Sequence, residues 1–449
     1  MNKLKWLYPG MRVKRWMVLS VLGAMFFGAG FILITNVGAF RILSYLYYQS
    51  FDPDGAGSPV GPGIVVLAVG LVMIIIGIRN TISSIIKALA PEKQGEVAEF
   101  IYQKHYLSRG PKVVVVGGGT GLSVLLRGLK KFTSNITAIV TVADDGGSSG
   151  KLRNEFGMLP PGDIRNCLVA LADKETLMED LFQHRFSIGE GLNGHSMGNL
   201  LIAAMTQIAG DFETAIREMS KVLAIRGHVL PATLDQCRLC AEFEGGLVVE
   251  GESEITEVGK RIKKRINRVF LKPGHCEPLP EALAAIADAD LIVLGPGSLY
   301  TSIIPNLLVK GMAEAITKSS AATVYVCNIM TQPGETDGYK ASEHIRAIRE
   351  HAGSGLINFA IVNGEDIPKT LQQKYRQDGA VPVSPDVKEI EKMNIKPIKR
   401  NLVFETDVVR HDPEKLSEAI MELADQLKYG SEKFNLQSLF LGKQRIREM

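Results

Sequence analysis

Glycines and carboxylates stand together where two short apolar runs of the chain end. The run 112–116 is followed by the glycine-rich segment 117–121, and the run 137–143 ends in Asp144 and Asp145. Glycine allows a backbone to approach a ligand closely, and the N-terminus of a following helix favours an anion. The aspartates suit ribose or sugar hydroxyls, or a Mg²⁺ ion that also binds phosphate oxygens. The pattern predicts a phosphate-bearing, nucleotide-type ligand.

Both features also have a purely structural interpretation. The glycine spacing departs from the G-x-G-x-x-G dinucleotide fingerprint, because Ser123 stands near the place of its last glycine. NAD is therefore not the predicted ligand, and a turn that only packs a helix on a strand stays an alternative. The aspartates could form a simple Asp-Gly turn, but two carboxylates beside glycine turns at two strand ends favour a binding site.

A third motif does not support its usual chemistry. GHSMG at 194–198 matches G-x-S-x-G, in which a hydrolase nucleophile directly follows a buried strand. The preceding residues, FSIGEGLN, do not have a strand pattern, so Ser196 is not predicted to be a nucleophile. The preferred interpretation is a helix N-terminus that presents His195, Ser196 and Asn199 to a ligand.

Alternating strands and helices must position these groups. The strand at 112–116, the helical leucines at 122–129 and the strand at 137–143 predict a βαβ unit with a parallel strand pair. The other elements expected are buried strands at 291–294, 322–327 and 356–362, an antiparallel pair at 237–250, and helices at 200–209 and 411–428. The predicted fold class is α/β, a Rossmann-like doubly wound, mostly parallel sheet with β additions.

The first 85 residues have a different pattern. Two uncharged apolar runs, 16–35 and 59–78, each approach the roughly 20 residues that cross a hydrocarbon core. The first run is too long for an ordinary signal peptide, and both lack the polar face of a core helix. Basic residues flank the pair, whereas the connection holds only Arg41 and a tyrosine cluster. The pattern predicts a two-span transmembrane hairpin in the cell (inner) membrane, with both termini and the main domain cytoplasmic.

Composition narrows the function classes. The 449 residues include 51 basic and 48 acidic side chains, so charge does not predict nucleic acid as a partner. Five cysteines do not suggest a disulfide framework, and a reducing compartment is the simpler expectation for the body. Cys237 and Cys240 form C-x-x-C without a second pair, in a stretch that alternates like a strand, so zinc or redox chemistry is not predicted.

Six segments of the body resemble the YvcK family of gluconeogenesis factors, which is similar to CofD, the 2-phospho-L-lactate transferase of coenzyme F420 biosynthesis. They are GGGTGLSVLLRGL, VADDGGSSGKLR, PPGDIRN, GHSMGNLLIA, GPGSLYTSIIPNLLV and CNIMTQPGETDGY, in this order between residues 111 and 345. The resemblance implies a Rossmann-like body that binds nucleotide ligands. It also implies binding of UDP-sugars, especially UDP-N-acetylglucosamine, and a role in cell shape and envelope synthesis. The usual family member lacks the apolar hairpin, so this chain is expected to depart from the family there.

These expectations divide the chain into a membrane hairpin (1–85), a connector (86–110), a CofD/YvcK-like nucleotide-binding domain (111–430) and a C-terminal tail (431–449). The predicted function is a membrane-anchored, nucleotide-sugar-binding regulator of carbon and envelope metabolism and of cell morphogenesis. The alternatives are a CofD-like, Mg²⁺-dependent transferase of a phosphate-linked group from a nucleotide donor, and a scaffold whose pocket only senses its ligand. The sequence leaves open whether the chain catalyses a reaction, whether it forms homo-oligomers, and which envelope-synthesis regulators are its partners.

The predicted site draws on every one of these segments. The predicted ligand- and phosphate-binding residues are Gly117, Gly118, Gly119, Thr120, Gly121, Arg165, Asn166, His195, Ser196, Asn199, Gly295, Gly297, Ser298 and Asn328. Asp144 and Asp145 are the candidates both for Mg²⁺ binding and for catalysis.

Overall fold

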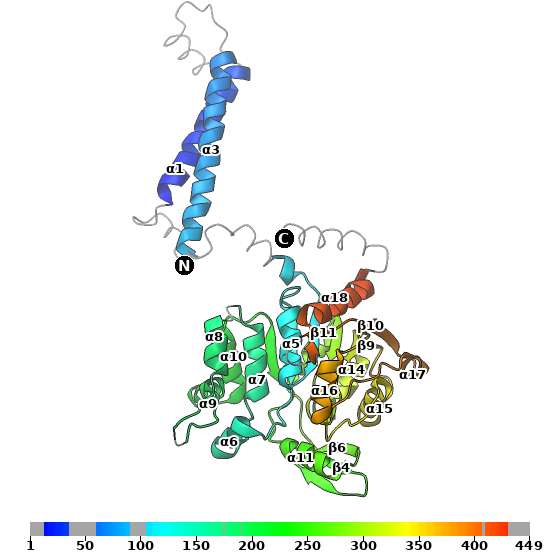
Figure 1. Cartoon of the computed structure of the whole chain (residues 1–449). Helices are drawn as coiled ribbons and strands as arrows, with labels where there is room; N and C mark the ends of the chain where they lie inside the picture. Colours follow the sequence, from blue (N-terminus) through cyan, green and yellow to red (C-terminus); the bar gives the residue numbers. More distant parts are fainter. Residues whose placement is uncertain are drawn as a thin grey trace, which may run out of the picture. The chain divides into compact units, whose positions relative to one another are not determined.

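The computed structural model describes residues 13–35, 60–89, 105–173, 176–189, 191–405 and 409–429. They belong to two compact units, Met1–Gln103 and Lys104–Met449 (Figure 1). The loop predicted between the apolar runs, most of the connector and the C-terminal tail lie outside the described residues.

The first unit contains two long apolar helices. These are α1 (Lys14–Thr35) and α3 (Val60–Leu89), and both are long and apolar enough to cross a membrane. The second helix continues beyond the predicted end of its apolar run at residue 78, because the polar segment after Arg79 keeps helical structure. The two apolar helices expected from the sequence are therefore present.

Glycines bring the backbones of α1 and α3 into direct contact. Gly23 and Gly30 of α1 lie against Gly70 and Gly63 of α3, so the helices run antiparallel. A Cβ atom added at Gly30 would lie only 2.4 Å from the backbone nitrogen of Leu67. Close approach through small residues is the usual way in which apolar helices pack without a hydrophobic driving force between them.

Strands and helices alternate through the second unit. The strands are β1 (Val113–Gly117), β2 (Ile136–Val140), β3 (His228–Pro231), β4 (Arg238–Phe243), β5 (Val248–Glu250), β6 (Ile266–Lys272), β7 (Leu291–Leu294), β8 (Ala322–Val326), β9 (Phe359–Asn363), β10 (Lys396–Arg400), β11 (Val403–Glu405) and β12 (Val409–His411). The helices before β7 are α5 (Gly119–Leu129), α6 (Gly147–Phe156), α7 (Gly162–Leu171), α8 (Thr176–Gln183), α9 (Met197–Ala209), α10 (Phe212–Val222), α11 (Glu252–Ile262) and α12 (Pro280–Ala287). After β7 come the π-helical turn η4 (Leu299–Ile303), α13 (Ile304–Leu308), α14 (Met312–Lys318), α15 (Ala341–Ala352), α16 (Lys369–Gln377), α17 (Val387–Lys392) and α18 (Pro413–Tyr429).

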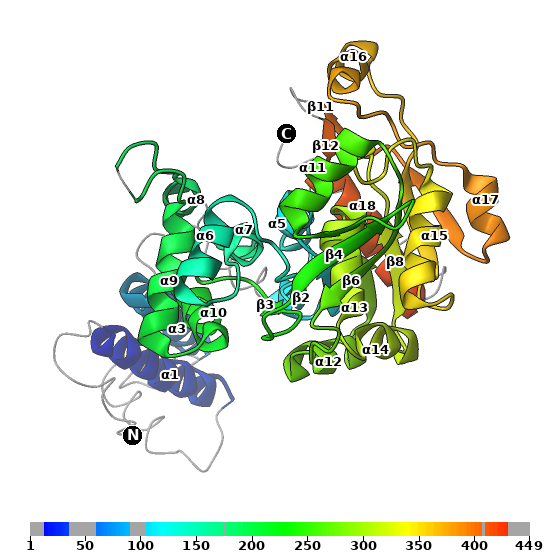
Figure 2. The same ribbon diagram turned by 90° about the horizontal axis from the view of Figure 1, so that it is seen from below.

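Seven parallel strands form the central sheet, in the order β10-β9-β8-β7-β1-β2-β3. The chain moves from β1 toward β3 and then from β7 toward β10, so its direction reverses between β1 and β7. Since crossovers are right-handed, this reversal puts the crossover helices of the β1–β3 half and those of the β7–β10 half on opposite faces of the sheet. One layer contains α5 packed against α7 and α18, and another contains α12 against α14 and α13 against α15 (Figures 1 and 2). The predicted doubly wound α/β fold is confirmed.

Two small antiparallel sheets are the β additions. One has the order β5-β4-β6 and packs against α11, and the other pairs β11 with β12. The predicted antiparallel pair around residues 237–250 is confirmed, and β6 extends it. β6 and the two edge strands of the large sheet, β3 and β10, have no counterpart in the sequence predictions.

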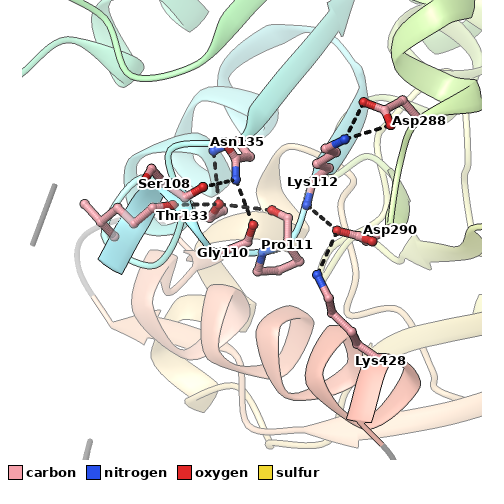
Figure 3. Close-up of polar contacts among 10 residues, drawn as sticks. Ser108, Gly110, Pro111, Lys112, Thr133, Asn135, Asp288, Asp290 and Lys428 are labelled. Carbon is pink, nitrogen blue, oxygen red and sulfur yellow. Dashed lines mark hydrogen bonds and ion pairs between the residues drawn. The ribbon is translucent and has the colours of Figure 1, made fainter. Parts of the chain in front are cut away.

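Polar contacts close the amino-terminal end of the sheet, where the chain enters the body (Figure 3). The backbone N–H of Lys112 donates to Asp290 Oδ2 over 2.8 Å, and its side-chain amine pairs with Asp288 at 2.6 Å. The Asn135 side chain donates to the carbonyl of Gly110 over 2.8 Å. The entry point is thus fixed at the end of β1 opposite to the glycine turn.

Candidate functional site

The glycine turns after β1 and β7 lie side by side at the topological switch point. A Cβ atom added at Gly121 would lie 2.8 Å from the carbonyl oxygen of Pro296, and one at Gly297 would lie 3.2 Å from that of Gly118. Gly119 has a φ of +68°, in the left-handed region that favours glycine. The glycines therefore have a packing role, and they place the start of α5 where open α/β sheets bind their ligands.

Asp163 occupies the position where an anion is expected. It lies in the first turn of α7, and its carboxylate accepts a hydrogen bond from the backbone N–H of Gly119 at the start of α5. A Cβ atom at Gly118 would lie 2.6 Å from Asp163 Oδ2. Burial, followed by the charge of Asp144, raises the pKa of Asp163 to about 7. The anion position at this helix start therefore already holds a carboxyl group of the chain.

The two aspartates after β2 have different surroundings. Asp144 Oδ1 accepts the backbone N–H of Gly146 at 2.9 Å, and burial raises the pKa of the Asp144 carboxyl. Asp145 Oδ1 instead accepts the backbone N–H of Ser253 at 3.1 Å, in the first turn of α11. A Cβ atom at Gly251 would lie 2.4 Å from Asp145 Oδ2. Asp145 thus holds α11 in place, whereas Asp144 faces Asp163.

Two further carboxylates approach from α11 and from the loop after β8. Burial, and then the charges of Asp144, Asp163 and Glu335, raise the pKa of Glu252 well above its usual range. Glu335 is 2% exposed, and burial raises its pKa to about 7. Oε1 of Glu335 accepts the hydroxyl of Thr256 at 2.9 Å. Oε2 of Glu252 and of Glu335 finds no hydrogen-bond partner among the described residues.

We call Asp144, Asp163, Glu252 and Glu335 the acidic cluster. Like charges raise each other's pKa when they are held together in a low-dielectric setting. In the described part of the chain, no three acidic, histidine or cysteine side chains converge closely enough to hold a metal ion by themselves. One or two of these carboxylates plus ligand oxygens is the arrangement that Mg²⁺ uses with phosphates.

Next to the acidic cluster, a buried polar network joins the starts of α6 and α9 to α7. Ser148 Oγ lies 3.0 Å from His195 Nδ1 and accepts the side-chain amide of Asn199 at 3.1 Å. Arg165 Nη1 donates to Asn199 Oδ1 over 2.9 Å and also to Ser196 Oγ. The structure therefore brings together four of the predicted ligand contacts from two separate helices.

Arg165 carries the positive charge of this network. It is 7% exposed, its Nη2 donates to Asn166 Oδ1 over 2.8 Å, and its Nε finds no partner within the described ranges. Burial lowers the pKa of Arg165, while the nearby charges of Asp163 and Asp144 oppose that effect. A buried guanidinium beside buried carboxyls is suited to hold a phosphate oxygen or to balance the acidic cluster.

Ser196 has a structural role in this network. It is the N-cap of α9, and its Oγ accepts the backbone N–H of Asn199 at 3.3 Å. No strand element of the described chain directly precedes it, and His195 Nδ1 faces Ser148 instead. The geometry of a nucleophile elbow is therefore absent at this serine.

The remaining predicted contacts support the two glycine turns. Asn328, after β8, donates its amide to the carbonyl of Gly297 over 2.8 Å. The carbonyl of Thr120 accepts the hydroxyl of Ser123 at 2.8 Å. The carbonyl of Ser298 accepts the backbone N–H of Ser302 at 2.9 Å and so starts η4. These groups shape the edge of the site.

Comparison with known proteins shows the family to which the chain belongs. Residues 113–403 match the family model of CofD, the 2-phospho-L-lactate transferase. The gluconeogenesis factor of Bacillus subtilis is 55% identical over 71% of this chain and 99% of its own length. The chain belongs to the gluconeogenesis factor family. A crystal structure of a Bacillus halodurans member of the UPF0052 family has a TM-score of 0.67 and 55% identity, over 70% of this chain and 99% of that one.

Members of the gluconeogenesis factor family differ in how much of this chain they match. A Clostridium acetobutylicum relative is 40% identical over 455 aligned positions, which cover 100% of this chain and 98% of its own length. The N-terminal unit therefore has an aligned counterpart in this relative. Other members, such as the Bacillus subtilis protein, match only 71% of this chain over 99% of their own length, so the family includes both shorter and full-length relatives.

The sequence predictions missed three members of the acidic cluster. Asp163 stands in PPGDIRN and Glu335 in PGETD, inside segments that carry the family resemblance, and Glu252 stands at the start of α11. The two prolines and the glycine before Asp163 are a helix-start signal that could have been noticed. The burial of all three depends on tertiary packing, which the sequence pattern does not show.

Proposed function

We propose that this chain is a membrane-anchored regulator that binds a nucleotide-sugar, such as UDP-N-acetylglucosamine, together with a divalent cation. The observation that carries the proposal is that Asp163, a member of the acidic cluster, lies directly against the glycine turn after β1. This turn and the start of α5 suit a diphosphate, and the adjoining polar network supplies neutral donors for sugar or ribose hydroxyls.

The position of Asp163 supports the cation. A diphosphate at the start of α5 would meet the Asp163 carboxylate, and like charges at that separation repel. Asp144 and Asp163 are the residues that would hold Mg²⁺, and Mg²⁺ would neutralise the diphosphate charge when bound. The raised carboxyl pKa values of Asp144 and Asp163, beside the unpaired carboxylate oxygens of Glu252 and Glu335, are what such a site contains before its cation binds.

The second candidate is a transferase of a phosphate-linked group. The match of residues 113–403 to the 2-phospho-L-lactate transferase model favours it. In that case Arg165 would hold a phosphate oxygen of the donor, and Asp163 or Glu252, with a raised pKa, would accept the proton of an acceptor hydroxyl. Incubation with UDP-sugars and candidate alcohols, followed by product analysis, separates turnover from binding alone.

Calorimetry with a UDP-sugar tests the binding proposal. The proteins are wild type, Asp144→Asn and the control Asp211→Asn, whose position is an exposed helix cap on α10. Each is titrated with the UDP-sugar once in the presence of Mg²⁺ and once in the presence of EDTA. Asp144→Asn should weaken binding by about 1–3 kcal/mol. If the carboxylate acts through Mg²⁺, EDTA and Asp144→Asn should not be additive. Equal affinity in all these titrations would remove the acidic cluster from the binding site.

The membrane anchor is part of the same proposal. It is supported by two antiparallel apolar helices of spanning length and by the excess of basic residues at their outer flanks. A reporter fused to the C-terminus should be active in the cytoplasm. Activity of that reporter outside the membrane would reverse the proposed orientation.

A further inference from the structure

A cavity lies between the C-terminal end of α6 and the β5-β4-β6 sheet. It has a volume of about 520 Å³, within the range of small-molecule sites. Its lining residues are Arg153, Asn154, Gln236, Arg238, Glu250, Lys272 and Pro273. They come from the last turn of α6 and from the β5-β4-β6 sheet. We call this space the basic cavity.

The basic cavity carries an excess of positive charge. Three cationic side chains, Arg153, Arg238 and Lys272, line it together with one carboxylate, Glu250. Glu250 accepts from Lys272 Nζ at 2.9 Å and from Arg238 Nη1 at 3.3 Å. Three cations and one anion leave a formal charge of +2 in the cavity. A phosphate monoester, with a charge between about −1.5 and −2 at pH 7, would balance it.

Arg153 is the buried member of this group. It is 7% exposed, and its Nη2 donates to the carbonyl of Cys237 over 2.5 Å. Its Nη1 is buried and finds no hydrogen-bond partner among the described residues. A buried guanidinium with an unused N–H group is costly, unless an anion with several acceptor oxygens completes its hydrogen bonds.

The basic cavity is lined by residues that the proposed nucleotide site does not use, and the charges of Asp145 and Asp144 also act on Arg153. Arg153 lies six residues after the start of α6 at Gly147, which is about 9 Å along a helix. On the opposite wall, Glu250 lines the cavity, whereas Glu252 belongs to the acidic cluster. A phosphate at the glycine turn and a phosphate in the basic cavity would therefore contact different residues.

We propose that the basic cavity is a second anion site, which binds the phosphate group of a small phosphorylated metabolite of sugar size. The volume is far larger than a free phosphate ion needs, so the cavity has room for the carbon skeleton as well. Arg238 provides N–H groups in the fork geometry that matches phosphate oxygens, Arg153 adds its unpaired Nη1, and Lys272 provides a point charge. Glu250 competes with the ligand for the two exposed cations.

Calorimetry on the purified full chain tests this site with two probes, inorganic phosphate and a hexose monophosphate. Lys272→Gln and Arg238→Gln should each weaken binding about tenfold. Glu250→Gln frees both cations and should strengthen binding by severalfold. Lys392→Gln is the matched control, because Lys392 forms an exposed pair with Glu389 at 2.7 Å on α17. It should leave the affinity of both probes unchanged.

Opposite effects of Lys272→Gln and Glu250→Gln cannot come from a general loss of folding. The proposal is wrong if both variants bind the probes as wild type does, or if neither probe binds wild type at millimolar concentration. It is also wrong if a saturating UDP-sugar displaces the phosphate, because the ion then lies in the nucleotide site. Failure of the UDP-sugar itself to bind would count against the proposed function and leave the second site standing.

Discussion

Replacing Asp163 by asparagine tests two effects of its charge, the loss of folding stability and the binding of the ligand. Asparagine keeps the size of the side chain and a carbonyl acceptor for the N–H of Gly119, but it removes the charge. Burial and the charge of Asp144 raise the pKa of Asp163 to about 7 from an ordinary 3.8. The folded state therefore holds this proton more tightly than the unfolded state, and the wild type loses stability as the pH rises between these two values.

The magnitude follows from the two pKa values. A difference of about three pKa units corresponds to about 4 kcal/mol. This is an upper bound, because the Asp163 residue is partly exposed. At pH 8, Asp163→Asn should raise the free energy of unfolding by up to that amount, and at pH 4 the two proteins should be nearly equal. The same variant should lose the stabilisation that Mg²⁺ and a UDP-sugar give to the wild type.

Urea unfolding followed by far-ultraviolet circular dichroism measures this effect on the body expressed from residue 105. Asp211→Asn is the control, because its carboxylate caps α10 and hydrogen bonds from the backbone N–H and the hydroxyl of Thr214 lower its pKa, so removing that charge should not stabilise the body at pH 8. The reasoning is refuted if Asp163→Asn is no more stable than wild type at pH 8. A gain of the same size at pH 4 would equally refute it, since the charge would then not be the cause.

Three further predictions concern other parts of the chain. Ser196→Ala should lower the free energy of unfolding by about 1–2 kcal/mol, because the α9 cap and a partner of Arg165 are lost. A fluorophosphonate probe should not label wild-type Ser196, and labelling would restore the nucleophile interpretation. Gly70→Ile should separate α1 from α3, because a Cβ atom there would lie 2.4 Å from the backbone nitrogen of Phe27. Gly28→Ile is the control, because a Cβ atom at Gly28 has open space. Equal hydrogen-exchange protection of α3 in the two variants in detergent would contradict this prediction. Residues 105–449 alone should be soluble and folded, as expected from a Bacillus subtilis relative whose whole length aligns with 71% of this chain; aggregation of this fragment would show that the body depends on the N-terminal unit.

Much of the fold could be predicted from local patterns. The run Val113–Gly117 is apolar and fully buried, the leucines of α5 have helical spacing, and α18 follows an amphipathic period. Such elements depend on which residues alternate over a few positions, and that information is local. The strands that were missed are β6, the small pair β11 and β12, and the edge strands β3 and β10. An edge strand packs less, and it carries polar residues and proline that hide its pattern: β10 has the sequence KPIKR and β3 ends in Pro231.

The candidate site could be predicted only in part from local sequence patterns. Glycines after a strand and paired aspartates mark the edge at which parallel strands end, so their proximity follows from the fold class alone. Sequence could not separate the roles of Asp144 and Asp145, because the difference depends on where α11 comes to lie. Nor could it find Glu252 and Glu335, which are 83 positions apart. Their raised pKa values come from burial beside other carboxylates, and burial is a property of the tertiary structure, which brings distant segments together and excludes water from between them.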